Sequence, residues 1–273
     1  MKYFRKIYLF VFTLLSFITV FLEVNAAVSE CTSKEKICSW LDQVVGIKTP
    51  MMIASGTIYL QDYIITNRHV VEDHEYVIVK FSNGKIKRAF PLYHNVPSDL
   101  VLLTFDNKND SYKNTEINVV NPSGNLRVIG YDQGRKKARI YKSGEIIAKS
   151  SEEFVQARIH TNAKSLPGNS GGAVVDDNGE LIGILASGSG TINEIIPIFV
   201  LNKIIKNISD KHKKSFNQTG FSIRMCADNL HLAHNIKNSP DKKLLNDLVK
   251  FCKISSNKQL LDNAGTTLGR WGY

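Results

Sequence analysis

The sequence predicts an all-β fold between about residues 50 and 205, with helical segments at both ends. Short runs rich in β-branched and aromatic residues recur along this stretch, among them YIITNRHVV, EYVIVKF, LVLLTF and ELIGILAS. Turn signals such as NGK, PSGN and DDNGE separate many of these runs. Many short strands joined by polar turns, with few helices between them, are typical of an antiparallel barrel or sandwich. The stretch NPSGN at 121–125 predicts a link between two halves of similar size.

The first 26 residues predict a secretory signal peptide that does not belong to this fold. A basic start, MKYFRK, precedes the apolar run IYLFVFTLLSFITVFL, and Ala26 ends the segment with Val24 two positions before it. We expect cleavage after Ala26 and export to the periplasm or to the outside of the cell. An uncleaved membrane anchor is the alternative, although the apolar run is short for a bilayer span, which needs ~20 residues. We therefore expect no stable membrane anchor.

The charge of the chain does not point to a nucleic-acid partner. The chain has 35 lysines and arginines against 25 aspartates and glutamates, a formal net charge of +10. The basic residues form short runs at 134–139 (GRKKAR) and 210–214 (DKHKK), and no aromatic residues interleave with these runs. A platform that stacks bases would need such aromatic side chains. We predict a solvated basic surface, and binding to an anionic surface is the alternative.

Four cysteines stand in the chain outside the signal peptide, namely Cys31, Cys38, Cys226 and Cys252. An even number of cysteines in an exported chain favours disulfides. Three pairings are possible; the local pairs 31–38 and 226–252 are the simplest, and a clasp between the two ends of the chain stays open. The alternative is a metal site that adds His231 and His234 to the last two cysteines. Its spacing matches none of the usual zinc patterns, so we expect no metal and no cofactor.

Both ends of the chain are predicted to be helical. Residues 27–49 form an expected N-terminal extension, in which 34–47 (KEKICSWLDQVVGI) has apolar residues at helical spacing. Residues 207–273 form an expected helical tail. Within this tail, SPDKKLLNDLVKFCKI predicts a helix with Ser239 as its N-cap and Pro240 at its first position.

Three residues in the β region have the types that nucleophilic catalysis needs. His69 lies within YIITNRHVV, at the end of a β-branched run, Asp99 precedes the apolar run LVLLTF, and Ser170 lies between glycines in PGNSGG. A serine hydroxyl is a poor nucleophile near neutral pH and needs a base, for which histidine is well suited. An aspartate on the far ring nitrogen fixes the tautomer and stabilises the imidazolium.

These segments resemble the chymotrypsin-like (trypsin-fold) serine peptidases, particularly the bacterial HtrA/Deg branch. The resemblance rests on IITNRHVV, SDLVLL, TNAKSLPGNSGGAV and GELIGI, with NEIIPIFVLNKII similar to the closing strand and helix of that family. It covers about residues 50–206 and implies a trypsin-like peptidase domain of two antiparallel six-stranded β-barrels. It further implies a serine endopeptidase that cleaves peptide bonds in protein or peptide substrates through an acyl-enzyme. In that reading Ser170 is the nucleophile, His69 the general base and Asp99 the orienting carboxylate.

The resemblance also gives a role to the residues around the serine. The backbone N–H groups of Gly168 and Ser170 are expected to form the oxyanion hole. Asn169 offers no charge to a newly cut N-terminal amine, so we expect no internal activation cleavage. The segment after residue 206 lacks the run of strands that a PDZ domain would need, and we expect no such domain.

The resemblance places the specificity pocket between two wall segments. One wall contains Lys164 and Ser165, and the other contains Ser187 and Ser189. Lys164 either attracts an acidic substrate side chain or points into solvent. Two further interpretations of the whole chain stay open: a catalytically silent binding protein on a peptidase fold, and a processing enzyme that cuts one host or envelope protein.

Overall fold

The computed structural model describes residues 31–107, 121–149, 154–188, 191–236, 240–255 and 257–272. The predicted signal peptide, residues 1–26, lies outside the described residues. Within the described ranges, no helix combines the length and the apolarity that a membrane span requires.

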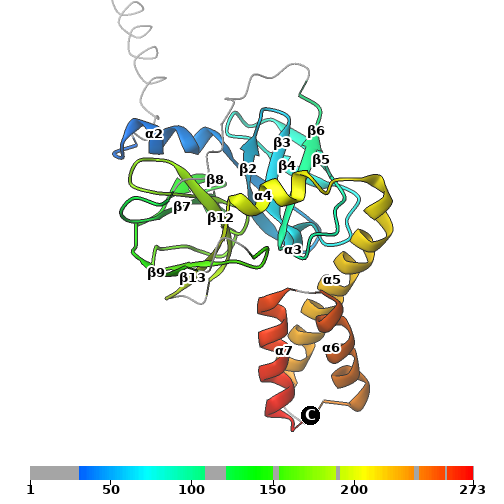
Figure 1. Ribbon diagram of the computed structural model, residues 1–273. Helices are drawn as coiled ribbons and strands as arrows, with labels where there is room; N and C mark the ends of the chain where they lie inside the picture. The colour runs from blue at the N-terminus through cyan, green and yellow to red at the C-terminus, as the bar shows by residue number, and fades with distance from the viewer. Residues whose placement is uncertain are drawn as a thin grey trace, which may run out of the picture. The chain divides into compact units, whose positions relative to one another are not determined.

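Six antiparallel strands form a closed barrel in the order β1-β2-β3-β6-β5-β4 (Figure 1). These strands are β1 (Val44–Lys48), β2 (Ile53–Tyr59), β3 (Tyr63–Asn67), β4 (Val77–Lys80), β5 (Ile86–Pro91) and β6 (Leu100–Phe105). Their buried residues are mostly β-branched or leucine. In β6 both faces are buried, with Val101 and Leu103 in one core cluster and Leu100 and Leu102 in another. This burial is the main source of the barrel's stability.

The second half of the β region is a seven-stranded sheet in the order β8-β7-β11-β12-β13-β10-β9. Its strands are β7 (Arg127–Asp132), β8 (Lys137–Ile140), β9 (Ile146–Lys149), β10 (Ile159–Thr161), β11 (Ala173–Val175), β12 (Leu181–Gly188) and β13 (Asn193–Pro197). The predicted all-β class and its two halves are confirmed. The second half was expected to be a six-stranded barrel, and it is a sheet of seven strands in which residues 141–145 separate β8 from β9. Gly144 in this break forms a bridge with Leu126.

The N-terminal segment is only partly helical. A helix α2 (Glu35–Cys38) and a 3-10 turn (Ser39–Asp42) precede β1. The prediction of helix up to residue 47 is wrong, because Val44 pairs with Thr57 of β2 and this segment is the first strand of the barrel. Apolar residues at 44, 45 and 47 satisfy a helical spacing and a buried strand equally well.

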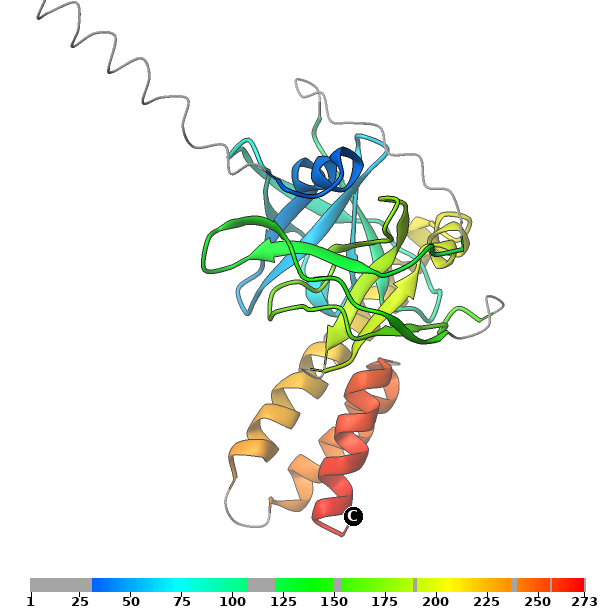
Figure 2. The same cartoon turned by 90° about the vertical axis from the view of Figure 1, so that its left-hand side faces the viewer.

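Helices follow the second sheet. They are α4 (Phe199–Ile205), α5 (Lys213–Asn235), α6 (Lys242–Ser255) and α7 (Lys258–Arg270). Figure 2 shows α5, α6 and α7 side by side. The predicted helix after Pro240 starts two residues later than expected, because the Asp241 side chain accepts a hydrogen bond from Leu244 N at 2.7 Å and caps it. Ser239 lies outside the described residues.

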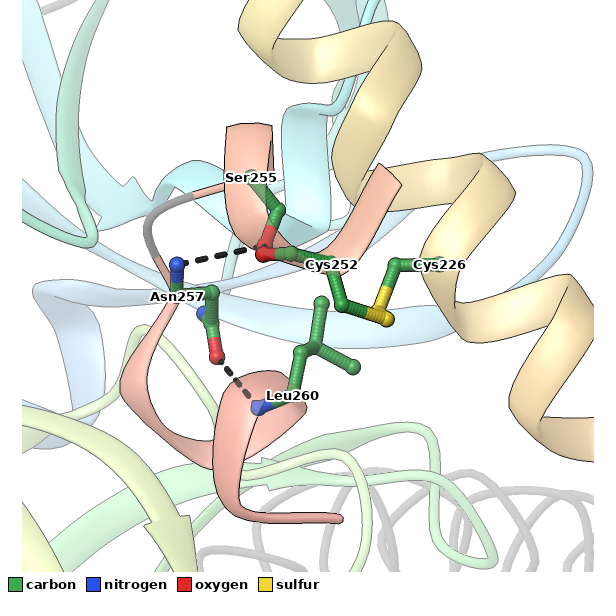
Figure 3. The surroundings of a disulfide bond; sticks show 5 residues. All are labelled: Cys226, Cys252, Ser255, Asn257 and Leu260. Atoms are coloured by element: carbon green, nitrogen blue, oxygen red, sulfur yellow. Dashed lines mark hydrogen bonds between the residues drawn. A yellow bond between two sulfur atoms is a disulfide. The ribbon is translucent and has the colours of Figure 1, made fainter. Parts of the chain in front are cut away.

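A disulfide joins Cys226 of α5 to Cys252 of α6 (Figure 3), with a Cα–Cα distance of 4.8 Å. Both cysteines are almost completely buried. Cys31 and Cys38 are disulfide-bonded as well. The alternative metal site with His231 and His234 is therefore wrong, because its two thiols are oxidised. Among the residues that the structure describes, no group of three histidine, cysteine or acidic side chains is arranged to hold a metal ion.

Candidate active site

His69 and Asp99 are joined by two hydrogen bonds. His69 lies in α3 (Arg68–Val71), a single turn of helix that follows β3, and Asp99 directly precedes β6. The His69 ring nitrogen Nδ1 lies 2.8 Å from Asp99 Oδ2, and the backbone N–H of His69 donates to Asp99 Oδ1 at 2.9 Å. Because β3 and β6 are neighbouring antiparallel strands, Asn67 pairs with Leu100 and the two ends meet. The pairing of the strands thus fixes the distance between the two side chains.

The two residues before His69 hold the backbone of Asp99. The Asp99 carbonyl oxygen accepts hydrogen bonds from Asn67 Nδ2 and from the backbone N–H of Arg68, both at 3.1 Å. Asp99 is 8% exposed, and Asn67 is completely buried. Since both partners lie in the segment that carries His69, the carboxylate and the imidazole cannot shift independently.

The Asp99 carboxylate controls the protonation of His69. Burial of the imidazole disfavours its charged form, but the charge and hydrogen bond of Asp99 outweigh this effect. The pKa of His69 is therefore raised above its ordinary value of 6.5. An imidazole with a raised pKa is a stronger base for a neighbouring hydroxyl, which is the property a general base requires.

The loop that carries Ser170 docks on the first barrel. Ser55 of β2 donates its backbone N–H to the Ser170 carbonyl at 2.8 Å and its hydroxyl to the Gly168 carbonyl at 2.7 Å. The Thr57 hydroxyl donates to the Gly171 carbonyl at 3.1 Å. The serine loop of the second half is thus fixed to the sheet of the first half, which also leads into His69.

Two glycines in this loop have backbone conformations and close contacts that a residue with a side chain would not tolerate. Gly168 has φ +96° and Gly171 has φ +86°, a region that favours glycine. A Cβ on Gly171 would lie 2.0 Å from the Ser55 carbonyl oxygen and 2.4 Å from Thr66 Oγ1. The close approach of the loop to β2 and β3 therefore depends on the missing side chain.

The polar groups of Ser170 are oriented by few contacts. Its hydroxyl donates to the Ala186 carbonyl at 3.2 Å. Within the described residues, the backbone N–H groups of Gly168 and Ser170 donate to no protein acceptor. Uncommitted backbone N–H groups in the loop of a serine hydroxyl can stabilise a negative oxygen.

Asn169 fixes the shape of the loop from inside the protein. The side chain is completely buried, and its Oδ1 accepts a hydrogen bond from Leu166 N at 2.7 Å. Its Nδ2 donates to the Tyr131 carbonyl and to the Tyr141 hydroxyl, both at 3.2 Å. These three partners require a side chain that both donates and accepts hydrogen bonds. An aspartate carboxylate at this position would only accept them.

A hollow of about 600 Å³ opens beside Ser170. It is lined by residues 48–54, Gln133, Pro167, Gly168 and Ser170. Met51 in this lining is 64% exposed, and Ile53 is 39% exposed. The hollow therefore offers an apolar surface next to the serine hydroxyl.

The four predicted pocket residues have different surroundings. Lys164 has an exposed side chain, whereas the Ser165 hydroxyl donates to Asn193 Oδ1 at 2.6 Å. The Ser187 hydroxyl donates to Glu194 Oε2 at 3.3 Å. Ser189 lies outside the described residues.

Two contributors near the pocket were missed by the sequence analysis. Asn193 is 3% exposed and donates its amide to the Ala163 carbonyl, and a Cβ on Gly188 would lie 2.0 Å from Asn193 Oδ1. Glu194 accepts from Ser187 and has His160 Nε2 at 3.4 Å from its Oε1. The available signal was the pair of polar residues, Asn193 and Glu194, that opens an otherwise apolar strand.

Comparison with known proteins shows which proteins this part of the chain resembles. A family model described as a trypsin-like peptidase domain matches residues 54–184. The HtrA-like serine protease of Staphylococcus aureus (strain USA300) is 28% identical over 201 residues, a match that covers 64% of this chain and 26% of that protein. The chain thus spans about a quarter of the length of this curated relative.

Solved structures show the same similarity. The serine endoprotease from Yersinia pestis superposes with a TM-score of 0.54 at 26% identity, covering 65% of this chain and 66% of that chain. The Rv3671c protease of M. tuberculosis, in an inactive form, has a TM-score of 0.54 at 17% identity and covers 64% of this chain and 93% of that chain. This second likeness concerns the fold alone.

The barrel, the second sheet and the match of residues 54–184 support a chymotrypsin-fold serine peptidase domain. Within this class, the domain is similar to the HtrA-like serine protease of Staphylococcus aureus and to the serine endoprotease from Yersinia pestis.

Proposed function

We propose that the chain is a serine endopeptidase that cleaves peptide bonds in proteins, with Ser170 as nucleophile, His69 as general base and Asp99 as the orienting carboxylate. The observation that carries the proposal is the doubly hydrogen-bonded His69–Asp99 pair, at 2.8 and 2.9 Å, on the barrel to which the Ser170 loop is fixed. We further propose that residues 50–206 are the peptidase domain and that residues 207–273 form a separate tail.

The first chemical step forms the acyl-enzyme. The Nδ1–H of His69 donates a hydrogen bond to the Asp99 carboxylate and stays on the ring, which leaves Nε2 free to accept the Ser170 proton. The hydroxyl exchanges its hydrogen bond with the Ala186 carbonyl for one with His69, and Oγ attacks the substrate carbonyl carbon. His69 then returns the proton to the leaving amine. In the second step water, activated by His69, cleaves the ester and releases the acid.

The oxyanion that forms in both steps needs hydrogen-bond donors. The backbone N–H groups of Gly168 and Ser170 are uncommitted to protein acceptors in the described part of the chain, which supports this role. The loss of one such donor typically lowers kcat by ~10²–10³. The hydrogen bond from the Ser55 hydroxyl to the Gly168 carbonyl helps to fix the orientation of the loop.

The substrate pocket is proposed to be short and polar, between the walls that contain Lys164, Ser165, Ser187 and Ser189. The side chain of Asn193 lies between Ser165 and Gly188 and takes up room at this place. We therefore expect preferred cleavage after small residues. Peptides with Ala, Val, Glu or Lys before the scissile bond test this preference. Faster cleavage after Glu, lost in Lys164→Ala, would support attraction by Lys164 instead.

Labelling with a fluorophosphonate probe tests the function itself. The probe reacts with an activated serine, so the wild type is expected to be labelled and Ser170→Ala is not. His69→Ala is expected to abolish labelling as well, since it removes the base. No labelling of a folded wild type would favour the alternative, a catalytically silent binding protein. Mapping of new N-termini made by wild type but not by Ser170→Ala would then separate broad from single-substrate cleavage.

We also propose that the chain is exported to the periplasm or outside the cell by the signal peptide at residues 1–26. The disulfides of the structure are compatible with an oxidising compartment. N-terminal sequencing of the exported protein is expected to start at Ala27; a start at Met1 would contradict this proposal.

A further inference from the structure

We propose that helix α5 positions His69, so that the C-terminal helices set the turnover of the active site. The inference rests on the proposed function of His69 as general base. It concerns the contact between α3 and α5, and α5 lies outside residues 54–184, the part that the peptidase family model matches. Helix α3 carries His69, so α5 packs against the element that holds the proposed base.

Helix α3 cannot hold its own geometry. It has four residues, so most of its backbone end groups have no partner inside the helix. Glu72, which directly follows, has φ 52°, a value that is uncommon for a residue other than glycine. The position of His69 therefore depends on what packs against α3.

Arg68 links α3 to α5 through its side chain. The guanidinium is almost completely buried; Nη1 donates to the Glu72 carbonyl, and Nη2 donates to the Phe216 carbonyl of α5 at 2.6 Å. The Phe216 ring centroid lies 3.6 Å from Arg68 Cζ, at the distance of a cation–π contact. Burial lowers the pKa of Arg68 to about 9. The buried charge thus depends on acceptors that α5 provides.

The same residue connects α5 to the acid of the site. The backbone N–H of Arg68 donates to the Asp99 carbonyl, while its side chain reaches Phe216. Arg68 therefore contacts Asp99 on one side and α5 on the other, and His69 is its direct neighbour in the chain. A shift of α5 would move Arg68 and with it the geometry of the His69–Asp99 pair.

Two further contacts fix α5 at this place. Gly220 packs so closely that a Cβ there would lie 2.0 Å from the Glu72 carbonyl oxygen and 2.3 Å from its carbon, both backbone atoms. Four residues along α5, Arg224 forms a two-point ion pair with Asp73, with Nε–Oδ1 at 2.9 Å and Nη2–Oδ2 at 2.8 Å. Helix α5 thus contacts α3 or the residues just after it at Phe216, Gly220 and Arg224.

The substitution Gly220→Ala tests the proposal. Alanine is the better helix former, so the change favours α5 itself and disturbs its contacts with Glu72 and Arg68. We expect kcat to fall between about tenfold and a hundredfold, since a displacement of about 1 Å at a catalytic group has effects of this order. KM is expected to change by less than about twofold, because α5 does not line the hollow beside Ser170.

Gly265→Ala is the matched control. Gly265 lies in α7, and a Cβ there would meet nothing within 4 Å. The same chemical change in another helix is expected to leave kcat and KM at wild-type values. Circular dichroism at the assay temperature checks that both variants are folded.

A second variant and a second readout keep the test decisive. If Gly220→Ala does not fold, Arg224→Ala takes its place and is expected to lower kcat, with partial rescue in Arg224→Lys. The NMR resonance of the His69 Nδ1 proton reports the bond to Asp99 without turnover, and we expect it to shift or broaden in the folded variant. Unchanged kcat and unchanged resonance in the folded variant would overturn the inference.

The outcomes also separate this inference from the proposed function. If the folded wild type is not labelled by a fluorophosphonate, the proposed function fails. The claim that α5 sets turnover falls with it, whatever the NMR resonance does. If the wild type is labelled while Gly220→Ala is labelled at the same rate, only the role of α5 fails.

Discussion

The Cys226–Cys252 disulfide is expected to contribute several kcal/mol to the stability of the C-terminal helices. The bond closes a loop with a sequence separation of 26 residues. In the chain-entropy treatment, opening a loop of this length lowers the free energy of unfolding by about 3.5 kcal/mol at 25 °C. In Cys226→Ala/Cys252→Ala, the loss of two buried sulfurs from the cluster with Leu248 adds about 1 kcal/mol or more.

Urea unfolding followed by circular dichroism measures this contribution. The reference is Cys31→Ala/Cys38→Ala, in which reductant can open only the bond between α5 and α6. Reduction of this reference is expected to cost about 3.5 kcal/mol, and the additional double alanine substitution somewhat more. A change below about 1 kcal/mol on reduction would refute the reasoning, because the loop closure would then have no effect on the unfolded chain.

Three further predictions concern the pH dependence and the loop. Because Asp99 raises the pKa of His69, kcat/KM is expected to rise with pH through a midpoint above 6.5, and Asp99→Asn should lower that midpoint in a pH–rate profile. Asn169→Asp removes the donor to Tyr131, and urea unfolding should show a loss of about 2–4 kcal/mol; an unchanged midpoint would contradict this. Burial raises the pKa of Glu72 from 4.5 to about 7, so the folded state binds more protons there and stability falls as pH rises across that window; Glu72→Gln should flatten this slope.

The parts of the site that could be predicted are those that short sequence patterns encode. Ser170, His69 and Asp99 lie at the ends of runs whose residue types are characteristic by themselves, and the structure brings His69 and Asp99 within hydrogen-bond distance. Ser55 and Asn193 could not be predicted in the same way. Ser55 contacts Gly168, which lies 113 positions away in the chain, and no local sequence pattern around either residue indicates this contact.

The helix error at the N-terminus has a related cause. Val44, Val45 and Ile47 are all buried, and a fully buried strand has no alternation of apolar and polar residues. Only the pairing with β2 and β4 distinguishes this segment from a helix, and pairing is a property of the folded chain. The β-branched residues at these positions were the one local signal in favour of a strand.

Helix α5 contacts the segment that carries the proposed base, although α5 lies outside the residues that the family model matches. The residues matched by the peptidase family model, 54–184, contain the proposed triad and the loop that carries Ser170. They do not contain Phe216 or Gly220, which contact Arg68 and Glu72 on either side of His69 along the chain. A buried guanidinium that loses its acceptors either moves into solvent or leaves a charge uncompensated, and both outcomes disturb α3. The proposed catalytic geometry is therefore a property of the peptidase domain together with α5, and substitutions in α5 should affect kcat although they lie far from Ser170 in the sequence.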